Sequence, residues 1–250
     1  MKIVSWNCSG ALRNKTQLID RLEADIVIVQ ECENPLHSTT VYRTWANDYL
    51  WYGESKNKGI GIFAKNGHRI KCLNWHNDFH ISGLKSKSRS ISWKTSDLKL
   101  FMPVMVNESL TILAVWTKGS EIEMFGYMGQ FWKYLQLHRS ELTNSNTLIV
   151  GDFNSNSIWD KPDRWWNHSD VIEELNEIGI NSLYHHQFNE KQGIETMPTF
   201  FLHRNMDKAY HIDYAFVSSD LLPQCDLNIG SKSDWLSFSD HMPLIVKINN

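Results

Sequence analysis

Cysteine is scarce in this sequence. Its 250 residues contain four cysteines, and no C-x-x-C motif joins any two of Cys8, Cys32, Cys72 and Cys225. This spacing argues against a zinc knuckle and against a disulfide scaffold. The chain also lacks the run of about eighteen apolar residues that a membrane span requires, and its N-terminus has no basic head followed by an apolar block and a cleavage site. These absences predict a cytoplasmic protein with reduced thiols and no membrane partner.

Positive charge is not in excess either. Lysine and arginine together number 25 against 28 aspartate and glutamate residues, which gives a formal net charge of -3. This balance argues against a protein that coats nucleic acid non-specifically, but it allows a local cleft that gathers phosphates. Internal repeats, low-complexity tracts and Pro/Ser linkers are absent, and 42% hydrophobic residues suffice for a buried core. We therefore expect one folded domain over residues 1–250.

One segment departs from this balance. Between Glu54 and Lys94 the chain has nine basic and two acidic residues, a local excess of seven positive charges. Lysine-rich strand edges discourage pairing with other chains, so a solvated set of β-meander turns is one interpretation. The other interpretation is a phosphate-tracking rim in which Lys85, Lys87 and Arg89 bind nucleic acid. The sequence leaves both open.

Hydrophobic patterning predicts many strands and few helices. Strands are expected over residues 2–6, 25–30, 59–64, 88–93, 98–104, 110–116, 147–150, 212–217 and 243–248. A helix is expected over residues 15–22. A longer one is expected over 121–137, where a single apolar stripe contains Met124, Met128, Phe131, Trp132 and Leu135. A third helix is expected from Asp170, with Glu173 as its capping partner, to Gly179.

Two of the expected buried strands end in a carboxylate. The first runs into Gln30-Glu31, and the second runs into Gly151-Asp152-Phe153-Asn154. A carboxylate is costly to desolvate unless a positive group meets it, and a hard cation such as Mg²⁺, bound through oxygen ligands, often supplies that charge. For either residue alone, the competing interpretation is an acidic side chain that simply reaches water at the end of a strand.

The C-terminal part adds the segments His211-Ile212-Asp213-Tyr214 and Ser239-Asp240-His241. Neighbouring residues of an extended chain point to opposite sides, so His241 pairs more readily with a distant acid than with Asp240. Asp213 is the candidate partner. A single histidine is more often structural than catalytic, and this chain has 11, so His241 alone would be weak support for catalysis.

Five short motifs, taken together and in order, strengthen the case for catalysis. They are Trp6-Asn7-x-x-Gly10, Gln30-Glu31, Gly151-Asp152-Phe153-Asn154, Asp213-Tyr214 and Ser239-Asp240-His241. Across nearly the whole chain this order resembles the endonuclease/exonuclease/phosphatase superfamily, which includes exonuclease III-like abasic-site endonucleases and deoxyribonuclease I. The resemblance implies an α/β (α+β) fold, a four-layer sandwich of two packed mixed β-sheets flanked by helices. It also implies an active site at one end of the sheets.

The resemblance further implies a metal site. Glu31 would be the principal ligand of Mg²⁺, or of Mn²⁺ in its place, and Asn7 would contact the metal or the phosphate. Asp240 would lie beside the metal or fix the histidine loop. A phosphodiester is an anion that repels hydroxide, so a cation that neutralises its oxygens and the leaving group lowers the barrier to hydrolysis.

Catalytic roles are implied in the same way. Asp152 would orient or deprotonate the attacking water, which must lie in line with the leaving oxygen. Asn154 would hold a phosphate oxygen, and Asp213 would support His241, which would contact the phosphate or act as the base. Thr199 matches a threonine that supports the site, and we include it among the residues expected to bind substrate.

The sequence also departs from the family pattern. Ser9 stands where exonuclease III-like members carry an acidic residue, and Trp116 stands where related enzymes have a catalytic histidine or tyrosine. Lys118 is close enough in sequence to substitute as a substrate contact, although a solvated loop lysine is an equally good interpretation. These changes weaken the case for an abasic-site enzyme and leave the metal, water and His241 components intact.

Tryptophan is abundant, with 11 residues in the chain. Trp159, Trp165 and Trp166 follow the Asp152 motif in one loop, where they would either stack on unpaired bases or pack beneath the loop. The leading functional hypothesis is a Mg²⁺-dependent phosphodiesterase, an endonuclease or exonuclease of nucleic acid. The alternative is a phosphomonoesterase or a lipid or inositol phosphate hydrolase on the same scaffold. A binding domain with a decayed site is less favoured, because the expected site residues are all present.

Overall fold

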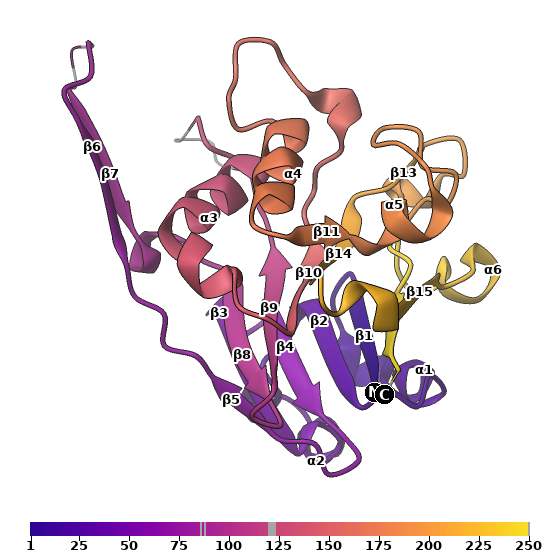
Figure 1. Cartoon of the computed structure of the whole chain (residues 1–250). Helices are drawn as coiled ribbons and strands as arrows, with labels where there is room; N and C mark the ends of the chain where they lie inside the picture. Colours follow the sequence, from indigo (N-terminus) through magenta and orange to yellow (C-terminus); the bar gives the residue numbers. More distant parts are fainter. Residues whose placement is uncertain (86, 88, 120–123, 250) are drawn as a thin grey trace.

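Two six-stranded sheets form the centre of the computed structural model, which describes residues 1–85, 87, 89–119 and 124–249 (Figure 1). The first sheet has the order β15-β16-β1-β2-β4-β3. Its strands are β1 (Lys2–Asn7), β2 (Ile26–Cys32), β3 (Asp48–Ser55), β4 (Lys58–Ala64), β15 (Cys225–Ile229) and β16 (Leu244–Ile248). The second has the order β11-β14-β10-β9-β8-β5. Its strands are β5 (Ile70–Cys72), β8 (Phe101–Val106), β9 (Leu110–Trp116), β10 (Thr147–Asp152), β11 (Ile180–Ser182) and β14 (Asp213–Ser218).

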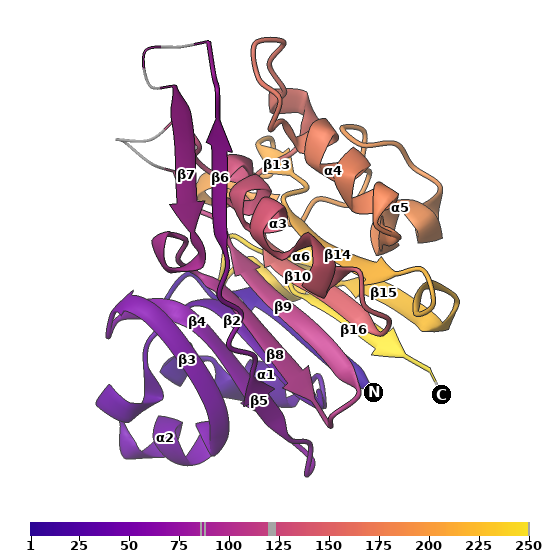
Figure 2. The ribbon, with the colours of Figure 1, turned by 60° about the vertical axis from the view of Figure 1, so that its left-hand side comes forward.

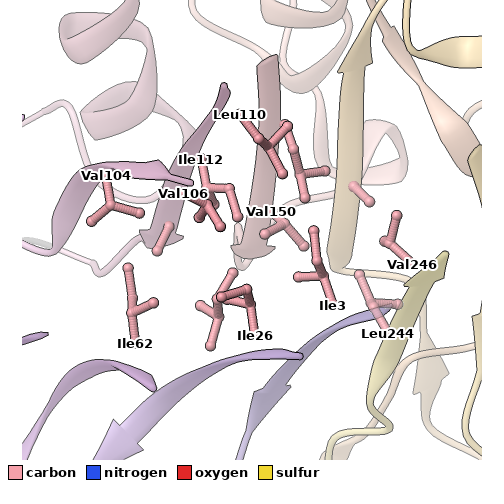
Figure 3. Packing of buried hydrophobic residues seen from close by; sticks show 14 of the residues in the cluster. Ile3, Ile26, Ile62, Val104, Val106, Leu110, Ile112, Val150, Leu244 and Val246 are labelled. Atoms are coloured by element: carbon pink, nitrogen blue, oxygen red, sulfur yellow. The ribbon is translucent and has the colours of Figure 1, made fainter. Parts of the chain in front are cut away.

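Branched aliphatic side chains fill the space between the sheets. Ile3, Ile26 and Ile62 of the first sheet meet Val104 and Val150 of the second, and all five are fully buried (Figure 3). Burial on both faces explains why these strands read as continuous apolar runs rather than alternating patterns. This shared core fixes the two sheets face to face.

Helices cover the outer faces of both sheets. They are α1 (Thr16–Asp20), α2 (Thr40–Ala46), α3 (Met128–Leu142), α4 (His168–Glu177) and α6 (Lys232–Trp235). Helix α5 (Leu183–Phe188) lies instead at an edge, against β14 and β15, and adds Leu183 and Tyr184 to the core between the sheets. A second buried cluster packs α3 and α4 on the second sheet, and a third packs α1, α2 and Trp235 of α6 on the first. The result is the four-layer sandwich with mixed sheets that the resemblance implied. Within the described residues, no helix is both long enough and apolar enough to cross a membrane.

Strand register brings the residues of the candidate site to one edge of the sheets. Strands β1 and β2 are parallel, with Asn7 opposite Gln30, so both deliver their last residues to the same end of the first sheet. In the second sheet β10 pairs with antiparallel β14, and Asp152 lies opposite Asp213. The C-terminal ends of β1, β2 and β10 therefore meet the N-terminal end of β14.

Two smaller antiparallel pairs lie outside the sandwich. They are β6 (Asp78–Ser82) with β7 (Ser90–Lys94), and β12 (Phe200–Phe201) with β13 (Ala209–Tyr210). The first pair is a long hairpin that projects from the body in both views (Figures 1 and 2). We call residues 78–94 the basic ribbon. It is anchored by Trp93, whose ring stacks on Phe79 at 4.3 Å and whose Nε1 donates to the carbonyl of Lys133 at 3.0 Å.

The helix expected over 121–137 is shifted toward the C-terminus. Its expected first residue, Glu121, lies outside the described residues, and Met124 is 74% exposed and outside the helix. The helix α3 begins at Met128 because Tyr127 takes a left-handed conformation, with φ of 50°. The apolar stripe from Met128 onward is buried as expected, but the same spacing at Met124 does not belong to the helix.

Other boundaries differ for local reasons. Helix α4 begins at His168 because Asn167 and Asp170 form the capping box, so the Asp170–Glu173 box expected from the sequence is wrong. Gly179 follows this helix with φ of +74°, as expected for a left-handed C-terminus. Strand β8 begins at Phe101 and not at residue 98, because Leu100 has a positive φ of 66°. The expected strand start at Ser88 lies outside the described residues, and β7 begins at Ser90.

Candidate active site

Asp152 is the most deeply buried carboxylate at this edge, with 1% of its surface exposed. Its Oδ2 accepts from Nδ2 of Asn7 at 2.9 Å, and its Oδ1 accepts from the backbone N–H of Asn154 at 2.9 Å. Burial raises the pKa of Asp152 above its usual range, and the negative charge of Asp213 adds to this, whereas His241 opposes both. A nearby positive charge would therefore stabilise the ionised carboxylate.

His241 and Asp213 form a buried pair, as expected from the sequence. Nδ1 of His241 lies 2.9 Å from Oδ2 and 3.1 Å from Oδ1 of Asp213, and its Nε2 lies 3.9 Å from Oδ2 of Asp152. Burial lowers the pKa of His241, but the two carboxylates outweigh this and raise it above the ordinary histidine value. The ring is thus fixed by Asp213 at one nitrogen and presents the other toward Asp152.

Glu31 reaches the site through an irregularity in β2. The register with β4 shifts between Gln30 and Cys32, and Glu31 has a positive φ of 62°. A left-handed glutamate is uncommon and costs strain, and such strain concentrates at functional sites. Oε1 of Glu31 lies 3.5 Å from Nδ2 of Asn7, and its Oε2 forms a 2.6 Å ion pair with Lys58. Lys58 was not among the site residues expected from the sequence.

The turn after β10 is shaped by a glycine. Gly151 has φ of +151°, and a Cβ at this position would lie 1.9 Å from the carbonyl oxygen of Val115. Only glycine permits this close approach of β10 and β9. Two residues beyond Asp152, Asn154 has φ of 46° and its Nδ2 donates to the carbonyl of Thr117 at 3.1 Å. The Gly151-Asp152-Phe153-Asn154 sequence thus places two polar side chains beside each other at the end of the strand.

Thr199 supports the site from beneath. It is fully buried, and its Oγ1 accepts from the backbone N–H groups of Ile212 and Asp213, each at 3.0 Å. Thr199 therefore fixes the backbone at the start of β14, and its expected contact with substrate stays a prediction. Ser239 acts similarly on the other side, since its Oγ donates to the carbonyl of Asn7 at 2.7 Å and accepts from the N–H of His241 at 3.1 Å.

A metal ion would find hard oxygen donors here. Among the described residues, Asp152, Asp213 and His241 have ligand atoms within 4.8 Å of one another. Asp152 and Glu31 accept from the same amide nitrogen of Asn7, so their oxygens flank one small region. Carboxylate oxygens suit Mg²⁺, and a cation would offset the burial cost of Asp152. These donors fit a divalent cation.

The remaining expected residues lie further out. Asp240 is outside the metal-capable group, although its charge contributes to the raised pKa of His241. Nζ of Lys118 lies 4.2 Å from the Trp116 ring centroid and 3.4 Å from Oε2 of Glu54, so the lysine is held at the surface by its neighbours.

The basic residues singled out from the sequence lie at the end of the ribbon. The residues concerned are Lys85, Lys87 and Arg89, and all three are exposed. In Figure 1 the ribbon lies beside α3 and extends upward, in the direction in which the β9 arrow points. These residues therefore belong to a hairpin outside the sandwich, and both interpretations of their charge stay open.

A cavity of about 500 Å³ adjoins the centre. Asn154 lies on its wall, and the aromatic residues that line it include Trp159, Phe200 and Tyr210. The three tryptophans that follow the Asp152 motif differ in burial. Trp166 is only 4% exposed, whereas Trp159 and Trp165 are 45% and 57% exposed. Packing beneath the loop therefore explains Trp166 only.

Solved structures share this architecture over the whole chain. A 3′-5′ exonuclease from Neisseria meningitidis matches with a TM-score of 0.69 at 16% identity, covering 100% of both chains. An AP endonuclease from Archaeoglobus fulgidus matches with a TM-score of 0.68 at 16% identity, also covering 100% of both. The catalytic domain of Xenopus laevis APE2 matches with a TM-score of 0.65 at 17% identity, covering 100% of this chain and 92% of that one. The chain described here therefore has the fold of the exonuclease III-like proteins.

No known family model matches the sequence, and no curated protein matches it either. The structural similarity thus confirms the fold expected from five short motifs. At such low identity the functional assignment must rest on the residues of the site.

Proposed function

We propose that this protein is a Mg²⁺-dependent phosphodiesterase that hydrolyses nucleic acid. The observation that carries the proposal is the buried group of Asp152, Asp213 and His241, closed by Asn7 and Asn154. Such a group combines a carboxylate to hold water, an oriented imidazole and amides to contact a phosphate. The fold similarity to nucleases supports the same reaction class.

Each residue has a proposed part in the reaction. Glu31, with Asn7, would hold the cation, which supplies charge neutralisation at the phosphate when bound. Asp152 would orient or deprotonate the attacking water, since its Oδ2 lies 3.9 Å from Nε2 of His241, the group proposed to contact the phosphate. Asn154 would donate to a non-bridging oxygen, and His241, fixed by Asp213, would donate from Nε2 to the phosphate.

The proposal also covers the surface around the site and the location of the protein in the cell. The basic ribbon would contact the phosphate backbone outside the centre through Lys85, Lys87 and Arg89, with Lys118 closer to the site. All four cysteines are free, which agrees with a cytoplasmic location.

Substitution of the proposed principal ligand tests the metal assignment. Glu31→Gln retains the shape of the side chain but removes its charge, so we expect at least a hundredfold loss of kcat with the fold unchanged. Glu23→Gln, which removes a charge from an exposed residue, is the matched control. Activity would be measured with Mg²⁺ or Mn²⁺, and in excess chelator. Full turnover by Glu31→Gln or in chelator would contradict the metal assignment.

The substrate panel tests the reaction class. It should contain single- and double-stranded DNA, abasic duplex, RNA, a 3′-phosphorylated strand and a soluble inositol phosphate. We expect cleavage of internal or terminal phosphodiester bonds in at least one nucleic acid. Hydrolysis confined to the phosphomonoesters would favour the alternative phosphatase function.

A further inference from the structure

A lysine contacts the proposed principal metal ligand. Nζ of Lys58 lies 2.6 Å from Oε2 of Glu31, and Oε1 of the same carboxylate lies 3.5 Å from Nδ2 of Asn7. The side chains of Lys58 and Glu31 are 55% and 21% exposed, so solvent reaches both. The ammonium group therefore neutralises the carboxylate that a bound cation would require.

The bulge in β2 and the start of β4 bring these two side chains together. Between them the register advances two residues on β2 against one on β4, so Glu31 is the extra residue of the bulge. Lys58 is the first residue of β4 and pairs with Ser55, where the β3–β4 hairpin closes. In this hairpin the carbonyl of Lys56 accepts from the backbone N–H of Asn34, just beyond β2, at 2.9 Å. The hairpin is thus tied to the segment that carries Glu31.

An ammonium group and a divalent cation compete for one carboxylate. A dication bound to Glu31 would lie close to Nζ of Lys58, and like charges at short range repel each other. Ion pairs between exposed side chains are weak, so a cation with further oxygen ligands displaces the lysine at little cost. Lys58 should therefore lower the affinity for the cation and leave Glu31 when the cation binds.

We propose that Lys58 exchanges between Glu31 and the substrate phosphate. It neutralises Glu31 before the cation binds, and it contacts a phosphate oxygen afterwards. The inference rests on the proposed function and adds a residue to that site. A lysine has three N–H donors on a flexible stem, so it moves between two anions while its backbone stays in β4. By linkage, a cation that frees Lys58 strengthens phosphate binding, and bound phosphate strengthens cation binding.

Neighbouring lysines are held by a different acid. Lys99 and Lys118 pair with Glu54 at 3.3 Å and 3.4 Å. Glu54 is not among the proposed metal ligands, so a cation at Glu31 leaves both of these ion pairs in place. The coupling between cation and phosphate is therefore expected at Lys58 and not at Lys99 or Lys118.

Cation binding without nucleic acid provides the first test. The affinity for Mn²⁺ alone would be measured by electron paramagnetic resonance of the free ion. Lys58→Met removes the competing charge and keeps a long side chain, so we expect Mn²⁺ to bind about fivefold more tightly. Lys58→Arg keeps the charge and should stay near wild type. Lys56→Met is the matched control, because it removes an exposed charge from the same hairpin, and it should change the affinity less than about twofold.

Salt dependence of nucleic-acid binding provides the second test. A short labelled single strand with phosphorothioate linkages, which slow hydrolysis, would be titrated by fluorescence anisotropy at several salt concentrations. In saturating Mn²⁺, Lys58→Met should weaken binding and flatten the slope of log affinity against log salt by roughly 0.7, the value for one phosphate contact on a single strand. In excess chelator the two proteins should have the same slope, because Glu31 holds Lys58.

The outcomes separate failure of the exchange from failure of the metal site. Equal Mn²⁺ affinities for Lys58→Met and Lys56→Met, or a salt slope in Mn²⁺ that Lys58→Met leaves unchanged, would overturn the exchange and leave the metal site intact. Mn²⁺ binding that Glu31→Gln does not weaken would instead overturn the metal site on which the proposed function rests.

Discussion

The proposed catalytic centre and the basic ribbon differ in the solvent exposure of their charged side chains. At the centre, Asp152, Asp213 and His241 are at most 4% exposed, and each is fixed by hydrogen bonds from a different segment of the chain. On the ribbon, Lys85, Lys87 and Arg89 are exposed and their hairpin pairs only with itself. The protonation of each group at the centre therefore depends strongly on its position and on the charges of its neighbours. The charges on the ribbon are screened by solvent and act nearly independently.

This difference determines what a mutation should do in each place. Removal of a group at the centre disturbs the protonation and orientation of its neighbours, so losses should be large and non-additive. Removal of a ribbon charge should cost little individually and should add to the next.

The largest effect is expected for the Asp213–His241 pair. His241→Ala and Asp213→Ala should each lower kcat by roughly 10³- to 10⁴-fold, because the ring loses either its presence or its orientation. The double variant should lose little more than either single one, since the two residues act as a unit. A complete double-mutant cycle measures this, and losses that multiply would show that the two residues act separately.

A smaller but still large effect on stability is expected for Gly151→Ala. The added Cβ would overlap the carbonyl oxygen of Val115, so β9 and β10 must separate at the site, at a cost of about 3–4 kcal/mol in free energy of unfolding. Gly67→Ala is the control, because Gly67 has φ of +80° but nothing within 4 Å of its Cβ position. Denaturant unfolding of both variants separates steric overlap from backbone strain, which alone costs about 1 kcal/mol. Equal losses of unfolding free energy in Gly151→Ala and Gly67→Ala would show that the structure relieves the overlap with Val115 without cost.

Acid should destabilise the wall of the 500 Å³ cavity through His168. Burial lowers the pKa of His168 to about 4, although its hydrogen bond with Gln192 opposes this shift. The unfolded chain takes up a proton near pH 6.5 but the folded chain does not, so stability should fall as pH drops from about 6.5 to 4, by up to about 3 kcal/mol. His168→Gln should flatten this dependence, and exposed His37→Gln should not. Identical pH profiles for wild type and His168→Gln would contradict the assignment.

Sequence patterning predicted the buried strands well because their apolar runs are unambiguous. The expected 110–116 and 147–150 segments match β9 and most of β10. Strand β15 was not predicted because Asp226 and Asn228 interrupt its apolar residues. Strand β3 was not predicted because its apolar residues Tyr49 to Tyr52 form a short run that is only partly buried. The start of α3 was misplaced because the hydrophobic period continues to Met124, whereas the chain conformation changes at Tyr127. Periodicity indicates a buried face but not where the backbone departs from a helix.

The site was predicted to a similar extent. The motifs place Asn7, Glu31, Asp152 and Asp213 within or at the ends of recognisable strands and His241 shortly before one, and the structure brings these residues together. The Glu31–Lys58 ion pair and the anchoring of Trp159 through Asn156 were not predicted, since both join segments whose proximity depends on strand order and bulges. Long-range contacts between surface loops leave no periodic signal in the sequence.

The smallest effects are expected on the ribbon, and they concern binding more than folding. Reversal of Lys85, Lys87 and Arg89 to glutamate should leave the free energy of unfolding within about 0.5 kcal/mol of wild type, because the side chains are exposed. Removal of one phosphate interaction should flatten the slope of log affinity against log salt by roughly 0.7 to 0.9. Nucleic-acid binding should therefore weaken and become less salt-dependent, while hydrolysis of a small phosphodiester continues at the wild-type rate.

A matched reversal separates local contact from overall charge. Three exposed lysines outside the ribbon provide the control: Lys191, Lys232 and Lys247. Both triple variants change the net charge equally, so a long-range effect of charge would weaken binding in both, whereas contact at the ribbon would change the salt slope in one only. Wild-type affinity and slope in the ribbon variant would mean that these lysines only solubilise a strand pair. The buried centre and its immediate surroundings would then have to account for nucleic-acid binding without the ribbon.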